Sequence, residues 1–113
     1  MAIQYKNQTF DLTGTVATTV LTIDVSSRAI LQNIQTQNVS TATTTVTALM
    51  YDNSATATTE FATIKLTTNT TQNVAKGPVV MEESDALKLK AGTGNVIKGL
   101  ISYALITGDQ GTA

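Results

Sequence analysis

Three carboxylates within four residues, Glu82, Glu83 and Asp85, form the group whose types and spacing come nearest to a chemical site. Carboxylate oxygens are ligands that Ca²⁺ prefers, and the ion takes about six to eight of them. The run lacks the Asp-x-Asp-x-Asp order of a calcium loop, and no distant second carboxylate with an aromatic platform completes a glycosidase pair. We therefore interpret it as a polar turn, and we expect no metal site, no cofactor and no catalytic residue.

Two other patterns could indicate a phosphate-binding loop or a nucleophilic serine. The run Gly92-Thr93-Gly94-Asn95 is rich in glycine, but no helix follows it that could point its N-terminus at a phosphate. We expect a tight turn there. The serines have no histidine to activate them, and no motif supports a lysine–serine pair. They are Ser26, Ser27, Ser40, Ser54, Ser84 and Ser102.

Three asparagines, Asn7, Asn38 and Asn69, begin Asn-x-Ser/Thr glycosylation motifs. Such motifs are used only on a secretory route. The first residues lack the basic start and apolar run of a signal peptide. Threonine makes up 23 of the 113 residues, so chance matches are expected, and we predict no glycosylation.

The residues that are absent exclude whole classes of function. The chain has no cysteine and no histidine, which argues against disulfide scaffolds, zinc, haem and iron–sulfur centres, and nucleophiles built on imidazole or thiolate. Seven basic and eight acidic groups give a net charge of −1, without the basic stripe of a nucleic-acid binder. No apolar stretch is long enough to span a membrane. We expect a protein that is not an enzyme and binds neither nucleic acid nor membrane.

The residues that would position any site belong to β-strands. Threonine, valine and isoleucine are 40 of the 113 residues, and they alternate with period two rather than with helical spacing. We predict an all-β fold, an antiparallel β-sandwich of jelly-roll or immunoglobulin-like type with about seven to eight short strands. The expected strands span residues 3–10, 16–23, 28–38, 44–51, 58–67, 78–81, 86–91 and 96–106.

The same alternation predicts which side chains enter the core. In 86–91, Leu87 and Leu89 should point inward, with Lys88 and Lys90 on a solvated face. Elsewhere we expect the core to contain Ile30, Ile34, Val74, Phe61 and Tyr103. The expected strand 96–106 is the most apolar and should be central. Only four residues separate it from 86–91, which predicts an antiparallel hairpin, and 68–77 should be a loop.

The chain divides by pattern into an N-terminal segment (1–15), a sandwich domain (16–107) and a polar tail (108–113). Residues 2–12 carry polar residues between a few apolar ones. They could form an ordinary edge strand of their own domain. They could instead form an arm, hinged near Gly14, that adds a strand to a neighbouring subunit.

Two stretches, 29–38 (AILQNIQTQN) and 78–91 (PVVMEESDALKLKA), resemble small β-sandwich proteins of tailed bacteriophage particles. That group includes capsid decoration (cement) proteins and neck or tail components. The resemblance covers about residues 16–106 and carries no catalytic or ligand residue. The group often has Gly-Asp where this chain has Ser84-Asp85, so Asp85 is the matched position.

The resemblance implies a virion structural protein, made in the bacterial host cytoplasm. Its partners would be copies of itself, with a trimer favoured, and the major capsid protein or other virion proteins. The composition agrees, because only 13% of residues are charged, and a polar uncharged surface suits subunits that meet each other or a lattice. A neck or tail component remains an alternative, as does a β-sandwich binding or adhesion module, although the absence of tryptophan argues against a sugar-binding face.

Overall fold

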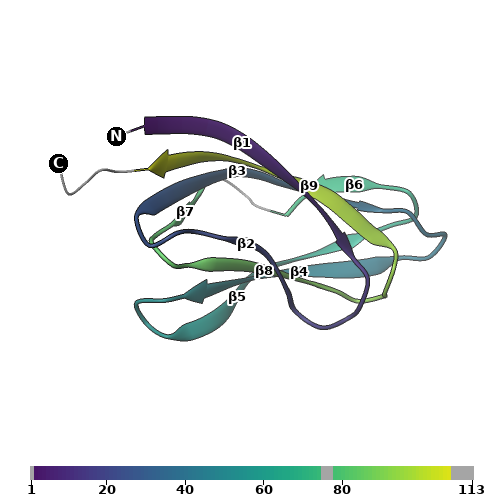
Figure 1. Ribbon diagram of the computed structural model, residues 1–113. Coiled ribbons are helices and arrows are strands. Elements are labelled where there is room, and N and C mark those ends of the chain that lie inside the picture. Colours follow the sequence, from purple (N-terminus) through teal and green to yellow (C-terminus); the bar gives the residue numbers. More distant parts are fainter. Residues whose placement is uncertain (1, 75–77, 108–113) are drawn as a thin grey trace.

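The structure is a computed structural model that describes residues 2–74 and 78–107. Over these residues the chain folds entirely into strands and turns (Figure 1). None of these residues belongs to a helix long and apolar enough to cross a membrane. The strands are β1 (Ala2–Leu12), β2 (Thr18–Thr22), β3 (Ser27–Asn38), β4 (Thr44–Asp52), β5 (Ala57–Leu66), β6 (Thr71–Asn73), β7 (Val79–Met81), β8 (Ala86–Ala91) and β9 (Ile97–Thr107).

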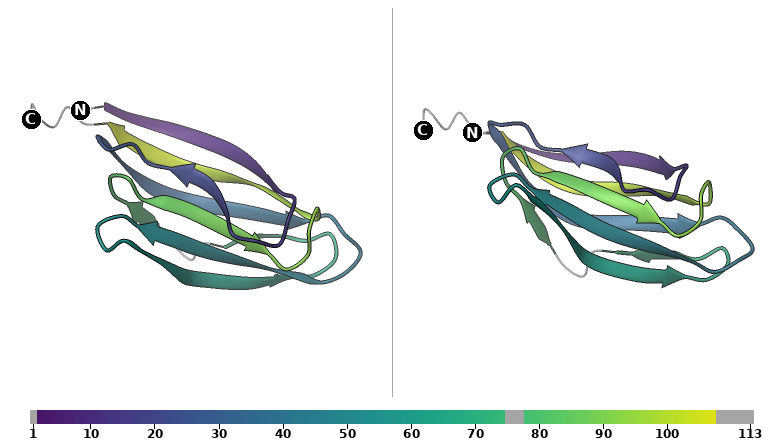
Figure 2. Two further views of the ribbon diagram at one scale, coloured as in Figure 1. Left: turned by 60° about the horizontal axis from the view of Figure 1, so that its bottom comes forward. Right: turned by 90° about the horizontal axis from the view of Figure 1, so that it is seen from below.

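The strands form two antiparallel sheets that pack face to face (Figure 2). The first sheet has the order β1-β9-β3-β6, and β7 also pairs with β3. The second has the order β2-β8-β4-β5. This arrangement confirms the predicted antiparallel β-sandwich, and it confirms that the last strand is central, since β9 lies between β1 and β3.

The pairing is nested in a way that identifies the sandwich as a jelly roll. The first strand pairs with the last, β2 with β8, β3 with β6 and β7, and β4 with β5. The chain thus behaves as one long hairpin that is wrapped around the core, so that successive paired strands fall alternately in the two sheets. Of the two sandwich types that the sequence left open, the topology selects the jelly roll.

The predicted hairpin between the last two strands is wrong, because β8 and β9 lie in different sheets. Their connection crosses from one sheet to the other. The Gly92 N–H donates to the carbonyl of Thr45 in β4 at 2.8 Å, and the Asn95 N–H donates to that of Leu12 in β1 at 3.2 Å. The five-residue link, residues 92–96, is short enough for a hairpin, but burying the apolar faces of both strands against each other places them in opposite layers.

The core fills the space between the sheets. Leu87 and Leu89 are fully buried and the lysines beside them are not, which confirms the register predicted for β8. The predicted burial of Ile34, Val74 and Tyr103 is also confirmed. The largest fully buried apolar side chains are Leu12, Leu31, Ile34, Val46, Leu66, Val74, Met81, Leu87, Leu89, Ile97 and Ile101.

Two predicted core residues lie elsewhere, and each is close to a β-bulge. In the β3–β9 ladder the register shifts between Leu31 and Asn33, so Ile34 faces the core while Ile30 faces outward and is half-buried. In the β4–β5 ladder, Ala48 pairs with Ala62 and Leu49 with Glu60. Phe61 is therefore the extra residue, and it is 40% exposed.

Several boundaries differ from the expected ones. The second strand begins at Thr18 rather than at residue 16, and a bulge buries both Val20 and Leu21. The expected loop at 68–77 contains the short strand β6, which pairs with β3. The rest of that loop at 75–77 and the predicted tail at 108–113 lie outside the described residues. The N-terminal residues form β1, an edge strand that pairs with β9 along its whole length.

Candidate functional site

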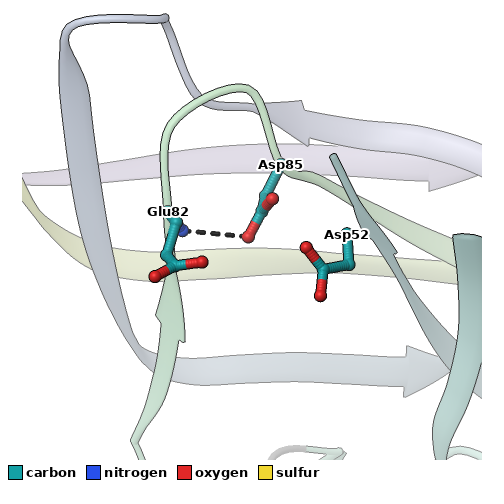
Figure 3. Close-up of side chains that lie close together, drawn as sticks. All are labelled: Asp52, Glu82 and Asp85. Atoms are coloured by element: carbon teal, nitrogen blue, oxygen red, sulfur yellow. Dashed lines mark hydrogen bonds between the residues drawn. The ribbon is translucent and has the colours of Figure 1, made fainter. Parts of the chain in front are cut away.

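The acidic turn that follows β7 is held together by Asp85. This residue is 5% exposed, and its Oδ2 accepts the backbone N–H of Glu82 at 2.9 Å (Figure 3). Its Oδ1 accepts the N–H of Asn53, in the turn after β4, at 3.0 Å. One carboxylate thereby joins two turns that are distant in sequence.

The structure changes the composition of the predicted acidic group. Carboxylate oxygens of Asp52, Glu82 and Asp85 all lie within 4.8 Å of one another (Figure 3). Sequence reasoning missed Asp52, because only the pairing of β4 with β8 brings it to the turn before β8. The spatial group replaces Glu83 with Asp52, since Glu83 forms an ion pair elsewhere.

Glu83 pairs with Arg28 of β3, with 3.0 Å between Oε1 and Nε. A backbone hydrogen bond at Glu83 itself and, to a smaller extent, the Arg28 guanidinium lower the pKa of the Glu83 carboxyl, while desolvation opposes them. Both side chains are largely exposed, so we regard the pair as a clamp between the acidic turn and the start of β3 rather than as a reactive group.

Three of the six carboxylate oxygens of the acidic group accept hydrogen bonds from described parts of the protein. Both oxygens of Asp85 accept backbone N–H groups. Asp52 Oδ1 accepts from Ser54 twice, from the N–H at 3.1 Å and from Oγ at 2.8 Å. These bonds stabilise the two turns. They agree with the interpretation of residues 82–85 as a polar turn. The absence of a metal site stays a prediction.

Asn38, the second glycosylation motif, is a buried hub. Its side chain is fully buried, and Nδ2 donates to the carbonyls of Ala42, Leu66 and Thr67 at 2.7, 3.1 and 3.2 Å. Its Oδ1 accepts the N–H and Oγ of Ser40 at 2.9 and 2.7 Å. The motif is therefore an Asx turn that ties the β3–β4 connection to the start of the β5–β6 connection. This structural role accounts for the Asn-x-Ser pattern without glycosylation.

The other predicted positions are dispersed. Asn7 lies exposed on β1, and Asn69 occupies a turn with a φ of 52°. The glycine-rich run forms the crossing between the sheets. Among the serines, Ser40 and Ser54 serve as turn partners, as described above, and the N–H of Ser27 closes the β2–β3 turn on the carbonyl of Asp24 at 3.2 Å.

A row of apolar side chains crosses the outer face of the first sheet, which no sequence pattern revealed because its members come from four strands. Residues that lie directly opposite each other in a ladder share a face. Tyr5 pairs with Ala104, Ala104 with Ile30, and Ile30 with Val80. Tyr5 is 79% exposed and Val80 is 62% exposed. We call these four residues the outer row, and beside it lies Ile3, opposite Ile106.

The outer face of the second sheet carries an ion pair and a cation–π contact. Lys90 lies 3.6 Å from Glu60, and the Lys88 ammonium lies 5.9 Å from the centre of the Tyr51 ring. These residues form the solvated face predicted for the lysines of β8. Ion pairs lie on the outer face of the first sheet as well, since Asp11 pairs with Lys98 on the same side of β1 as Tyr5. The two broad faces therefore differ in the apolar outer row rather than in charge.

Comparison with known proteins reveals a likeness of fold. No protein-family model matches the sequence, and no curated protein matches it. A chain of Bacillus endospore appendages, described as a novel family of disulfide-linked pili, is 19% identical, with a TM-score of 0.53 over 93% of this chain and 88% of that one. A chain of the acid-stable capsid of Helicobacter pylori bacteriophage KHP30 is 12% identical, with a TM-score of 0.57 over 94% and 88%.

Proposed function

We propose that this chain is a non-enzymatic structural protein of a bacteriophage particle, a capsid decoration (cement) protein that binds the capsid lattice as a homo-oligomer. The topology carries the proposal. The nested jelly roll is an architecture that viral capsid domains use repeatedly. The likeness to a chain of the KHP30 capsid, which extends over nearly the whole of both chains, supports it.

The surface supports the same role. Threonines and other polar uncharged residues dominate the exposed positions, and some of the described charges are paired, as Lys98 is with Asp11 at 2.9 Å. Interfaces avoid uncompensated charge at their centres because burying it costs free energy. The apolar outer row adds a face with which a partner protein could pack.

Particle composition tests this function. Mass spectrometry of purified particles should find the chain in tens to hundreds of copies, in proportion to the major capsid protein. Recombinant chain should also bind particles that lack it, and bound particles should resist heat better than bare ones. A neck or tail component would instead be present only in the number of copies that form one or two rings. Absence from particles would contradict every virion role.

The proposed role requires no metal. Treatment with a chelator should leave the melting temperature unchanged, because both oxygens of Asp85 and Oδ1 of Asp52 accept hydrogen bonds from the protein. A drop of several degrees that calcium reverses would instead assign an ion to the group of Asp52, Glu82 and Asp85.

The likeness to a chain of Bacillus endospore appendages favours a second candidate, a subunit of a surface fibre. The present 113 residues contain no cysteine, so such a fibre could not use disulfide links within this sequence. Electron microscopy of concentrated protein would distinguish the two, because a fibre subunit should polymerise alone, whereas a decoration protein should remain as discrete oligomers until particles are added.

A further inference from the structure

The edge of the first sheet formed by β1 is regular throughout its length. The ladder with β9 runs from Ala2 opposite Thr107 to Leu12 opposite Ile97 without a register shift. The strand contains neither proline nor glycine. An edge strand leaves half of its backbone N–H and C=O groups without a partner in its sheet, and proteins normally protect such edges.

The other sheet edges among residues 2–74 and 78–107 are protected. Strand β5 has the bulge at Phe61 and carries Glu60 and Lys65. Strand β2 has only five residues and a bulge. The edge opposite β1 is divided into β6 and β7, which have three residues each, and Pro78 precedes β7. Bulges, charges, short strands and proline are the usual devices against edge-to-edge pairing. Within the described ranges, β1 is the edge that lacks a bulge, a break and a proline.

The apolar outer row ends on this regular, unbroken edge. Its terminal residue, Tyr5, belongs to β1, and Ile3 continues the apolar surface along the same strand. A strand that paired with β1 would therefore gain main-chain hydrogen bonds and apolar contacts at once, which is the combination that strand addition uses.

We infer that β1 is an assembly edge, at which the β1 strands of two copies of this chain pair antiparallel about a two-fold axis close to Tyr5. In this register Tyr5 of each copy lies opposite its counterpart, and the two outer rows join into one apolar band across both first sheets. Each Lys6 then lies opposite Gln4, so no like charges oppose each other.

Neighbouring registers that also keep the two outer faces on one side are less favourable. An axis at Gln4 would pair only residues 2–6, whereas the axis at Tyr5 pairs residues 2–8. An axis at Lys6 would place two lysines opposite each other. An axis at Asn7 would place Ile3 opposite Asp11, whose carboxylate is already paired with Lys98. A second copy is therefore an occupant that this edge fits, and the axis at Tyr5 gives the best match.

The inference extends the proposed function. It rests on that function in one respect, that copies of this chain assemble with each other. The two can fail separately. A chain that is absent from particles but pairs through β1 would contradict the decoration role alone, whereas a chain that binds particles as a monomer would contradict the edge contact alone.

Sedimentation analysis of the full chain and of Tyr5→Lys tests the contact. The wild-type oligomer should have a mass that is an even multiple of the mass of one chain, whether it is a dimer or a pair of trimers. Tyr5→Lys introduces like charges at the axis and should halve that mass. Val25→Lys is the matched control, because Val25 is 78% exposed and lies in the β2–β3 turn. Circular dichroism should show that both variants keep the β fold.

A second variant makes the test independent of stability. The chain has no cysteine, so Tyr5→Cys provides a single thiol at the proposed axis. Under mild oxidation it should form a covalent dimer readily, whereas Val25→Cys should do so only slowly. A wild-type mass of one or three chains, a Tyr5→Lys mass equal to that of the wild type, or equal dimer yields from the two cysteine variants would each overturn the inference.

Discussion

The carboxylate of Asp85 accepts the backbone N–H of Asn53 at 3.0 Å, a contact between residues that are 32 positions apart in the chain. The same carboxylate accepts the N–H of Glu82 at 2.9 Å. A residue whose type first indicates ion binding therefore supports two turns of one end of the sandwich. The buried position of Asp85 makes each of these bonds expensive to lose.

Replacing Asp85 by asparagine should destabilise the fold by about 1–3 kcal/mol, because the amide has one acceptor oxygen where the carboxylate has two, and one partly buried N–H loses its partner. Asp24→Asn is the control, since Asp24 is exposed in the β2–β3 turn, and it should change stability by less than about 0.5 kcal/mol. Urea denaturation of the three proteins measures the difference. Equal midpoints for both variants would show that Asp85 is not a structural acceptor.

Asn38→Ala should be among the most destabilising single changes in the chain. It removes three donated bonds and two accepted bonds from a fully buried side chain, and we expect a loss of about 3 kcal/mol or more in the free energy of unfolding. Gln37→Ala, one residue earlier in β3 but exposed, should cost less than about 0.5 kcal/mol. Comparable losses for the two variants would contradict the role of Asn38 as a hub.

Regular alternation along a strand was the part of the fold that the sequence predicted well. In β8, Leu87 and Leu89 face the core because no bulge interrupts the six residues. Period two needs only local information, so a short uninterrupted strand can be assigned from its own residues.

Single-residue bulges were the part that it could not predict. Ile30 and Ile34 have the same parity, so alternation alone places both in the core, but the extra residue between Leu31 and Asn33 turns Ile30 outward. The outer row and the contact of Asp52 with the acidic turn could not be predicted from the sequence for a related reason. Both depend on which strands become neighbours in the nested jelly roll, and residue types along one strand do not encode that pairing.

The ion pair between Glu83 and Arg28 should make stability depend on pH in the acid range. The folded-state pKa of Glu83 lies below its ordinary value, so its contribution is complete above that ordinary value and is lost as the pH falls through the folded pKa. Denaturation curves over a pH series should therefore fall less steeply for Glu83→Gln than for the wild type. Arg28→Gln should remove only part of the dependence, because the backbone hydrogen bond at Glu83 lowers the pKa more than Arg28 does. Identical pH profiles for wild type and Glu83→Gln would refute this.

Gly99→Ala should destabilise the first sheet by about 1–3 kcal/mol through overpacking. A Cβ at this position would lie 2.6 Å from Cζ of Phe10, the residue opposite in β1, and would also meet the backbone carbonyl of Gln35. Because that carbonyl cannot move aside, a smaller residue at position 10, as in Phe10→Leu, should not restore stability. Gly14→Ala is the control, since nothing lies within 4 Å of its Cβ, and a melting temperature equal to or above that of the wild type is expected.

Ser84→Gly should stabilise the protein by relieving backbone strain in the turn before β8. Ser84 has a φ of 66°, in the left-handed region that costs a residue with a Cβ about 1–2 kcal/mol. Its N–H donates to the carbonyl of Ile23 at 3.0 Å, and glycine would keep that backbone bond.

Glycine also gains freedom in the unfolded chain, which offsets part of the benefit, so the expected net gain for Ser84→Gly is about 0.5–1 kcal/mol. Ser26→Gly provides the comparison. Ser26 is exposed in the turn before β3, and its φ is not positive, so the same substitution there should only cost stability. Thermal denaturation should therefore shift the two midpoints in opposite directions. A lower midpoint for Ser84→Gly would mean that the serine side chain stabilises the turn by more than its backbone strain costs.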